Sequence, residues 1–240
     1  MELFPVVGDM LHQRNDSPSL TIPELPSLDS GITLVEAEND PRLPLQTLMV
    51  DRLLLESGRA VWVGTGRYCT TDTLAEVSPD RRVLERVDVA RGFTPYQHTA
   101  LIGNLEANLG ENTEVVVLPD IDALYRGSDL QGDDGQEMLV RALAKLAGVA
   151  REYEIPVLCT RSKADGFSEP VETAATSTLA VQDTPMGPRF VGDEFETMVY
   201  ELEDGWVQTT IAFWQEVLQA RQPIHETANI SSGVFARGTV

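Results

Sequence analysis

The sequence predicts an α/β fold: a mainly parallel twisted sheet flanked by helices, with a C-terminal antiparallel hairpin at one edge. Three observations lead to this expectation. Apolar runs of strand length, such as 31–37 and 114–119, alternate along the chain with segments of helical pattern. These runs are apolar almost throughout, which is typical of parallel strands covered on both faces. With 240 residues, 42% of them hydrophobic, the chain suffices for one sizeable core.

The alternation assigns the central elements in order. Strands are expected at 31–37, 60–64, 86–93, 114–119, 155–160 and 177–182. Helices are expected at 43–58, 71–77, 96–109 and 136–153. The last helix repeats its leucines and alanines with a period near 3.6, which predicts one buried stripe of Leu139, Leu143, Leu146, Ala147 and Ala150.

The pattern changes after Thr176. Residues 196–213 contain two β-rich runs on either side of Asp204 and Gly205, a dipeptide typical of a two-residue hairpin turn. We expect this hairpin to add antiparallel strands at the sheet edge. A short helix should follow Trp214 and end near residue 221.

One folded domain with two tails is expected. Residues 1–30 hold several prolines among polar residues, which is typical of an extended arm. Residues 31–221 form the core domain. Residues 222–240 are polar and rich in glycine and serine, so a disordered tail is expected there.

The charge balance is strongly acidic. The chain has 38 acidic and 18 basic residues, a formal charge of -20, and Lys145 and Lys163 are its only lysines. Such a surface stays soluble in molar salt, so we interpret it as adaptation to a salt-rich cytoplasm. The alternative is an acidic surface that docks on a basic partner. Either interpretation disfavours nonspecific binding of nucleic acid.

Adaptation to salt has a measurable consequence. The free energy of unfolding is expected to rise as KCl increases from about 0.1 M to molar levels, because the Debye length shrinks from about 10 Å to about 3 Å and repulsion among carboxylates falls. Chemical denaturation at several KCl concentrations measures this. Greater stability in low salt would contradict the interpretation.

Several classes of protein and site are excluded. No apolar run reaches the roughly 18 residues that a membrane helix needs, and the first residues do not form a signal peptide, so a cytoplasmic protein is expected. Cys69 and Cys159 stand singly and are expected to be small buried side chains rather than zinc ligands or a disulfide. His98 has no histidine near it in sequence and is expected on a surface or interface.

Three segments carry a family resemblance: VDVARGFTPYQ at 87–97, EVVVLPDIDALYR at 114–126, and the long helix with its following strand at 136–161. Their order and spacing resemble the core of archaeal RadA, its RecA-like paralogues and the related KaiC-like proteins. The resemblance covers about residues 30–212 and implies a RecA-like sheet, with the second segment as its Walker B strand.

The resemblance also implies a phosphate loop after the first strand, with glycines around the phosphates, a lysine and a Mg²⁺-binding hydroxyl. The matching stretch has no glycine. Leu43 stands at the lysine position and Pro44 at the hydroxyl position. Glu38 and Asp40 would repel a triphosphate. The degenerate loop comprises Asp40, Pro41, Arg42, Leu43 and Pro44.

Two further catalytic positions of the family have changed. The acidic residue that positions the attacking water corresponds to Gly66. The metal-binding aspartate that ends the Walker B strand corresponds to Pro119, with Asp120 one position later. We therefore expect no ATP hydrolysis, no nucleotide cofactor and no metal.

The resemblance thus implies a catalytically inactive paralogue, an accessory or interaction subunit in DNA recombination or repair. Its partner would be a RadA-like recombinase or a second copy of itself. Two alternatives stay open. One is a KaiC-like signalling or transcription-associated regulator that binds a protein. The other is an enzyme of unrelated chemistry, with a site near Thr65, Asp120 and Arg161 at the carboxyl ends of the strands.

Candidate contact residues follow from the same resemblance. Phe4 matches a linker phenylalanine that inserts into a neighbouring subunit, and Arg126 ends the Walker B turn as an arginine does in the family. Arg161 and Lys163 form a small basic cluster in the second DNA-contacting loop. The first such loop, after Tyr125, is acidic, so direct DNA binding is disfavoured.

Overall fold

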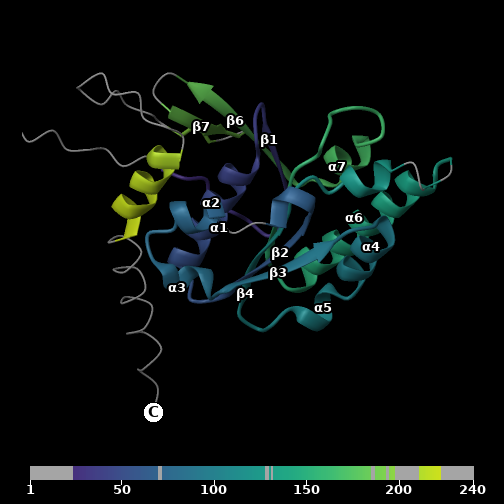
Figure 1. The fold of residues 1–240 in the computed structure, drawn as a ribbon, viewed down its shortest axis with the longest axis horizontal. Helices are drawn as coiled ribbons and strands as arrows, with labels where there is room; N and C mark the ends of the chain where they lie inside the picture. The colour runs from purple at the N-terminus through teal and green to yellow at the C-terminus, as the bar shows by residue number, and fades with distance from the viewer. Residues whose placement is uncertain are drawn as a thin grey trace, which may run out of the picture.

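A computed structural model describes residues 24–69, 72–127, 130, 132–184, 187–192, 195–197 and 211–222 of the chain. It confirms the α/β class. Seven strands form one sheet in the order β3-β2-β4-β5-β1-β6-β7, and only the β6–β7 pair is antiparallel (Figure 1). The strands are β1 Gly31–Ala37, β2 Arg59–Thr65, β3 Val87–Gly92, β4 Thr113–Leu118, β5 Pro156–Cys159, β6 Ser177–Thr184 and β7 Gly187–Val191.

Helices cover both faces of the sheet. The α-helices are α1 Arg42–Leu55, α2 Asp72–Val77, α3 Arg81–Leu84, α4 Pro95–Gly103, α5 Leu105–Asn108, α6 Asp134–Glu152 and α7 Glu169–Ala174, with a further helix at 211–222. Two 3-10 turns, η1 Gly66–Cys69 and η2 Ala123–Arg126, follow β2 and β4. The sheet therefore separates two hydrophobic cores.

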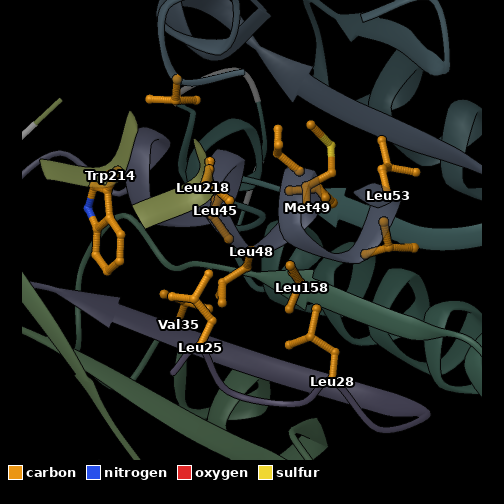
Figure 2. Packing of buried hydrophobic residues seen from close by; sticks show 14 of the residues in the cluster. Leu25, Leu28, Val35, Leu45, Leu48, Met49, Leu53, Leu158, Trp214 and Leu218 are labelled. Carbon is orange, nitrogen blue, oxygen red and sulfur yellow. The ribbon is translucent and has the colours of Figure 1, made fainter. Parts of the chain in front are cut away.

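The first core lies between the sheet and α1, α2, α3 and helix 211–222. Figure 2 shows Leu45, Leu48 and Met49 of α1 in this core, with Leu218 of the last helix near Leu45 and Trp214 at one side of the cluster. A buried ion pair joins the two helices, with Arg221 Nε 2.7 Å from Asp51 Oδ1. The second core lies under α4, α5, α6 and α7. The predicted stripe of α6 belongs to it, with Leu139, Leu143 and Leu146 buried.

Packing begins before the expected domain boundary. Residues 24–30 form no helix or strand, in keeping with an extended segment. Leu25 and Leu28 are nevertheless buried in the first core, and Figure 2 shows Leu25 beside Val35 of β1. The core thus includes part of the segment assigned to the arm, because its two leucines are buried against the sheet and α1. Both cysteines are buried and free, as predicted.

The edge of the sheet differs from the prediction. The strand that pairs with β6 is β7, residues Gly187–Val191, where a glycine and Pro188 hide the strand signal. Proline is tolerated there because β7 is the edge strand of the sheet, and the isolated bridge on its other side joins Val191 to Glu196 rather than Pro188. The predicted turn at Asp204 and Gly205 lies outside the described residues. The end of the predicted second run, Ile211 to Phe213, is helical rather than extended.

Two helical predictions also need correction. The segment 96–109 is not one helix, because it divides at Asn104 into α4 and α5. The second correction concerns the predicted DNA-contacting loop that holds Arg161 and Lys163, residues 161–177, because this segment contains α7. Pro170 lies in the first turn of α7, a position where proline costs no hydrogen bond, and Val171 is buried.

Candidate functional site

A cavity of about 410 Å³ lies where the parallel strands β1, β4 and β5 end. Its walls come from the β1–α1 connection, from Asp120 after β4, and from Thr160 to Ala164 after β5. The connections after β1 and β5 run in opposite directions across the sheet. The chain passes from β1 to β2 on one side and from β5 to β6 on the other. Such a switch point is where open α/β sheets bind their ligands. Asp40 and Pro41 of the predicted degenerate loop lie here with two predicted contact residues, Arg161 and Lys163.

In the degenerate loop, a carboxylate of the chain occupies the start of α1. Asp40 Oδ1 accepts a hydrogen bond of 3.0 Å from the backbone N–H of Arg42, the first residue of the helix. The same carboxylate accepts 2.8 Å and 3.0 Å bonds from the Nε of Arg42. Pro44 has no N–H to offer, and the N–H of Leu45 bonds to the carbonyl of Pro41 at 3.1 Å. The backbone N–H groups of Arg42 and Leu45, in the first turn of α1, therefore have hydrogen-bond acceptors within the chain.

Asp120 lies at the carboxyl end of β4 in a left-handed conformation, with φ of 45°. Its backbone N–H donates to Thr160 Oγ1 at 2.8 Å, and that hydroxyl donates to the Asp120 carboxylate at 3.1 Å. The next N–H, of Ile121, bonds to the Thr160 carbonyl at 3.0 Å. A non-glycine residue at positive φ stores strain that its surroundings must hold. Here β5 holds it, and the carboxylate lines the cavity.

Arg126 joins the loop after β4 to the loop after β5. Its guanidinium pairs with the fully buried carboxylate of Asp122 and, at 2.7 Å, with Asp165. The guanidinium also lies 4.6 Å from the ring centre of Phe167. The Arg126 guanidinium holds the pKa of Asp165 well below its usual range, and the hydrogen bond with Asp165 raises the pKa of Arg126.

The Asp122 carboxylate also holds the start of the loop after β5 by hydrogen bonds to Ser162. It accepts 2.6 Å and 2.9 Å hydrogen bonds from the backbone N–H and the hydroxyl of Ser162. One buried carboxylate thus connects η2 to the segment after β5, and Arg126 compensates its charge. Arg126 was expected as a contact residue, and in this structure its guanidinium crosslinks two loops of its own chain.

The two other predicted basic residues differ in exposure. Arg161 pairs with Glu36 of β1 and, at 3.0 Å, with Glu172 of α7, and its side chain is only 12% exposed. Lys163 is 72% exposed, with its Nζ 3.5 Å from Asp165. Of the predicted basic contacts, Lys163 is therefore the one whose charge faces solvent. Phe4 lies outside the described residues.

The charges around the cavity are predominantly negative. Four carboxylates line it, those of Glu36, Glu38, Asp40 and Asp120, against the two cations Arg161 and Lys163. The ion pairs described above engage Arg161 with Glu36, and Asp40 with Arg42. A polyphosphate would therefore meet uncompensated carboxylates. Thr65 ends β2 and is buried but does not line this cavity, whereas Asp120 and Arg161 both do.

His98 is fully buried, which corrects the expectation of a surface or interface histidine. Its Nδ1 lies 2.9 Å from the Tyr125 hydroxyl, which also accepts a 3.3 Å bond from Thr99. Its Nε2 has no hydrogen-bond partner among the described residues. Burial lowers the pKa of His98 to about 4 from an ordinary 6.5, so the imidazole is neutral at pH 7. It packs between Gly92 of β3 and η2.

Comparison with models of known protein families gave no match, and comparison with curated proteins gave none either. Within the described residues, no three histidine, cysteine or acidic side chains are arranged to hold a metal ion. No helix of that part of the chain is long and apolar enough to span a bilayer. The function is therefore inferred from the geometry of the cavity together with the motif resemblance.

The sequence predicted a site near Thr65, Asp120 and Arg161 at the carboxyl ends of the strands, and the cavity brings Asp120 and Arg161 together but not Thr65. Sequence reasoning missed Asp122 and Asp165, which determine what Arg126 does. The spacing of Asp122 and Arg126, four residues apart on a turn, was the available signal. No sequence signal connects Asp165 to them, since it lies 39 residues after Arg126.

Proposed function

We propose that the chain is a catalytically inactive RecA/RadA-like paralogue that acts as an accessory or interaction subunit in DNA recombination or repair. The observation that carries the proposal is the Asp40 carboxylate at the first N–H of α1. In phosphate-binding loops, a helix N-terminus receives the anionic group of the ligand. Here an aspartate of the chain supplies that anion, and its guanidinium partner is Arg42.

Three further features support loss of nucleotide chemistry. The residue at the Walker B aspartate position is Pro119, and Asp120 after it is turned into a left-handed conformation and bonded to Thr160. Gly66 stands at the position of the water-positioning acid. The cavity has more carboxylates than cations. Each feature weakens binding of a triphosphate with its metal. The chain would therefore act through contacts of its surface with partner molecules.

The first test is titration with nucleotide. Isothermal titration of the full chain in molar KCl with Mg²⁺, against ATP and a nonhydrolysable analogue, is expected to show no saturable heat. The reason is that a triphosphate would displace Asp40 from the start of α1 and face Glu38 and Asp120. A thermal melt of the same sample verifies the fold. Binding at micromolar concentration would overturn the inactive assignment.

The accessory role needs a partner experiment. Light scattering of the chain mixed with a purified RadA-type recombinase, at the same salt, is expected to show a complex heavier than either component. Single-stranded DNA alone is expected not to bind, because Arg126 and Arg161 are held in ion pairs. If no complex forms with the recombinase and the chain instead binds a signalling or transcription protein, the KaiC-like alternative is favoured.

A further inference from the structure

An apolar groove runs between α6 and α7, on the face of the sheet opposite α1 (Figure 1). Its volume is about 450 Å³, within the range of ligand-sized pockets. Val140, Leu143, Ala144 and Ala147 line it from α6, at the spacing of one helical face. Pro170, Thr173 and Ala174 line it from α7.

The groove is open because its walls are small. Alanines at 144, 147 and 174 leave space between the helices, so Val140 remains 47% exposed in the middle of an otherwise amphipathic helix. Val140 is one of five large hydrophobic side chains exposed within the described residues. An exposed valine beside a ligand-sized apolar hollow indicates a surface that another apolar side chain can fill.

One carboxylate, that of Glu169, lines the groove at its rim. Glu169 and Thr173 also border a neighbouring polar cavity of about 510 Å³, which Arg161, Asp165 and Glu172 line as well. Asp165 and Glu172 pair with Arg126 and Arg161 respectively. Among the described residues, no cation forms an ion pair with the exposed carboxylate of Glu169. The groove therefore suits an apolar side chain followed closely by a cation.

The two ends of this chain differ in how they match that chemistry. The apolar residues at 3–7 are flanked by Glu2 and Asp9, which the carboxylate of Glu169 would repel. The segment 234–237 reads Val-Phe-Ala-Arg, so a large apolar side chain precedes a cation by two residues. Its nearest acidic residue is Glu226. Charge complementarity with Glu169 thus selects the C-terminal segment.

We propose that the α6–α7 groove binds residues 234–237 of a second copy of this chain, with Phe235 in the hollow and Arg237 at Glu169. A second copy is favoured because helix 211–222 packs on α1, across the sheet from α6 and α7 (Figure 1). A tail of the same molecule would have to pass around the sheet edge. The proposal stands independently of the inactive-paralogue assignment.

Cysteine crosslinking between full-length chains tests it. Val140→Cys protein and Phe235→Cys protein are mixed in molar KCl under mild oxidation, where buried Cys69 and Cys159 do not compete. The mixture is expected to form a disulfide-linked heterodimer at least about tenfold faster than a matched mixture of Tyr153→Cys and Phe235→Cys, because docking raises the effective concentration of the two thiols. Tyr153 is 37% exposed at the far end of α6.

Equal rates in the two mixtures would overturn the proposal. A single chain carrying Val140→Cys and Phe235→Cys that closes an internal disulfide, without heterodimer in the mixture, would overturn the second-copy assignment. Light scattering gives an independent measurement: full-length Val140→Glu and Phe235→Ala are each expected to lower the dimer fraction, whereas Tyr153→Glu is not. A parent chain that stays monomeric by light scattering at about 1 mM would also contradict the proposal, because a contact between two copies strengthens with protein concentration.

Discussion

Arg126→Met is expected to lower the free energy of unfolding by about 3 to 5 kcal/mol, because it leaves a buried carboxylate without its cation. The Asp122 side chain is fully buried, and after the substitution Ser162 would be its remaining donor among the described residues. The Asp165 carboxylate would lose its bidentate partner as well. Urea denaturation of both proteins in the same molar KCl measures the difference.

Two comparison variants make this result specific. Arg141→Met removes an ion pair with Glu137 at 2.9 Å, in which both side chains are exposed, and is expected to cost at most about 0.5 kcal/mol. The double variant Asp122→Asn with Arg126→Met is expected to recover part of the loss, because no buried charge remains. If Arg126→Met costs no more than Arg141→Met, the loops after β4 and β5 do not depend on this ion pair.

Acidification is expected to destabilise the fold through His98. The pKa of this buried imidazole is about 4 in the folded chain and 6.5 ordinarily, so between these values the unfolded chain binds more protons. Stability from the neutral imidazole is therefore complete above about pH 6.5 and falls as the pH drops toward 4. This difference in pKa between the folded and the unfolded chain corresponds to a loss of about 3 kcal/mol in the free energy of unfolding.

The measurement is the free energy of unfolding at several pH values between 4 and 7, for the parent chain and for His98→Gln. The substitution is expected to lower stability at pH 7 and to flatten the dependence on pH. The difference between the two curves isolates His98, because other groups titrate in both proteins. Glu114, whose pKa burial raises, acts in the opposite direction and cancels in the difference. Parallel curves would mean that His98 reaches water or a partner when protonated.

The candidate site was predictable where strand order along the chain was enough. Parallel strands end at one edge of the sheet, so the loop after β1, Asp120 and Arg161 were expected near one another, and residues 38–41, Asp120 and Arg161 line one cavity. The chemistry of each position was readable too, since the loop lacks glycine and lysine. The partners of Arg126 were not readable, because the choice between solvent, DNA and Asp165 depends on side-chain distances.

The sequence by itself determined the α/β class, six of the seven strands, the amphipathic face of α6 and the acidity of the loop after β1. These follow from local periodicity and residue type, which need no knowledge of distant segments. The tertiary structure alone decided the rest. β7 is a strand because Phe190 is buried against Trp214, and His98 is neutral because β3 and η2 enclose it. Arg126 is an internal crosslink because Asp165 lies opposite it. Contacts between segments far apart in sequence carry no local pattern, so only the folded chain reveals them.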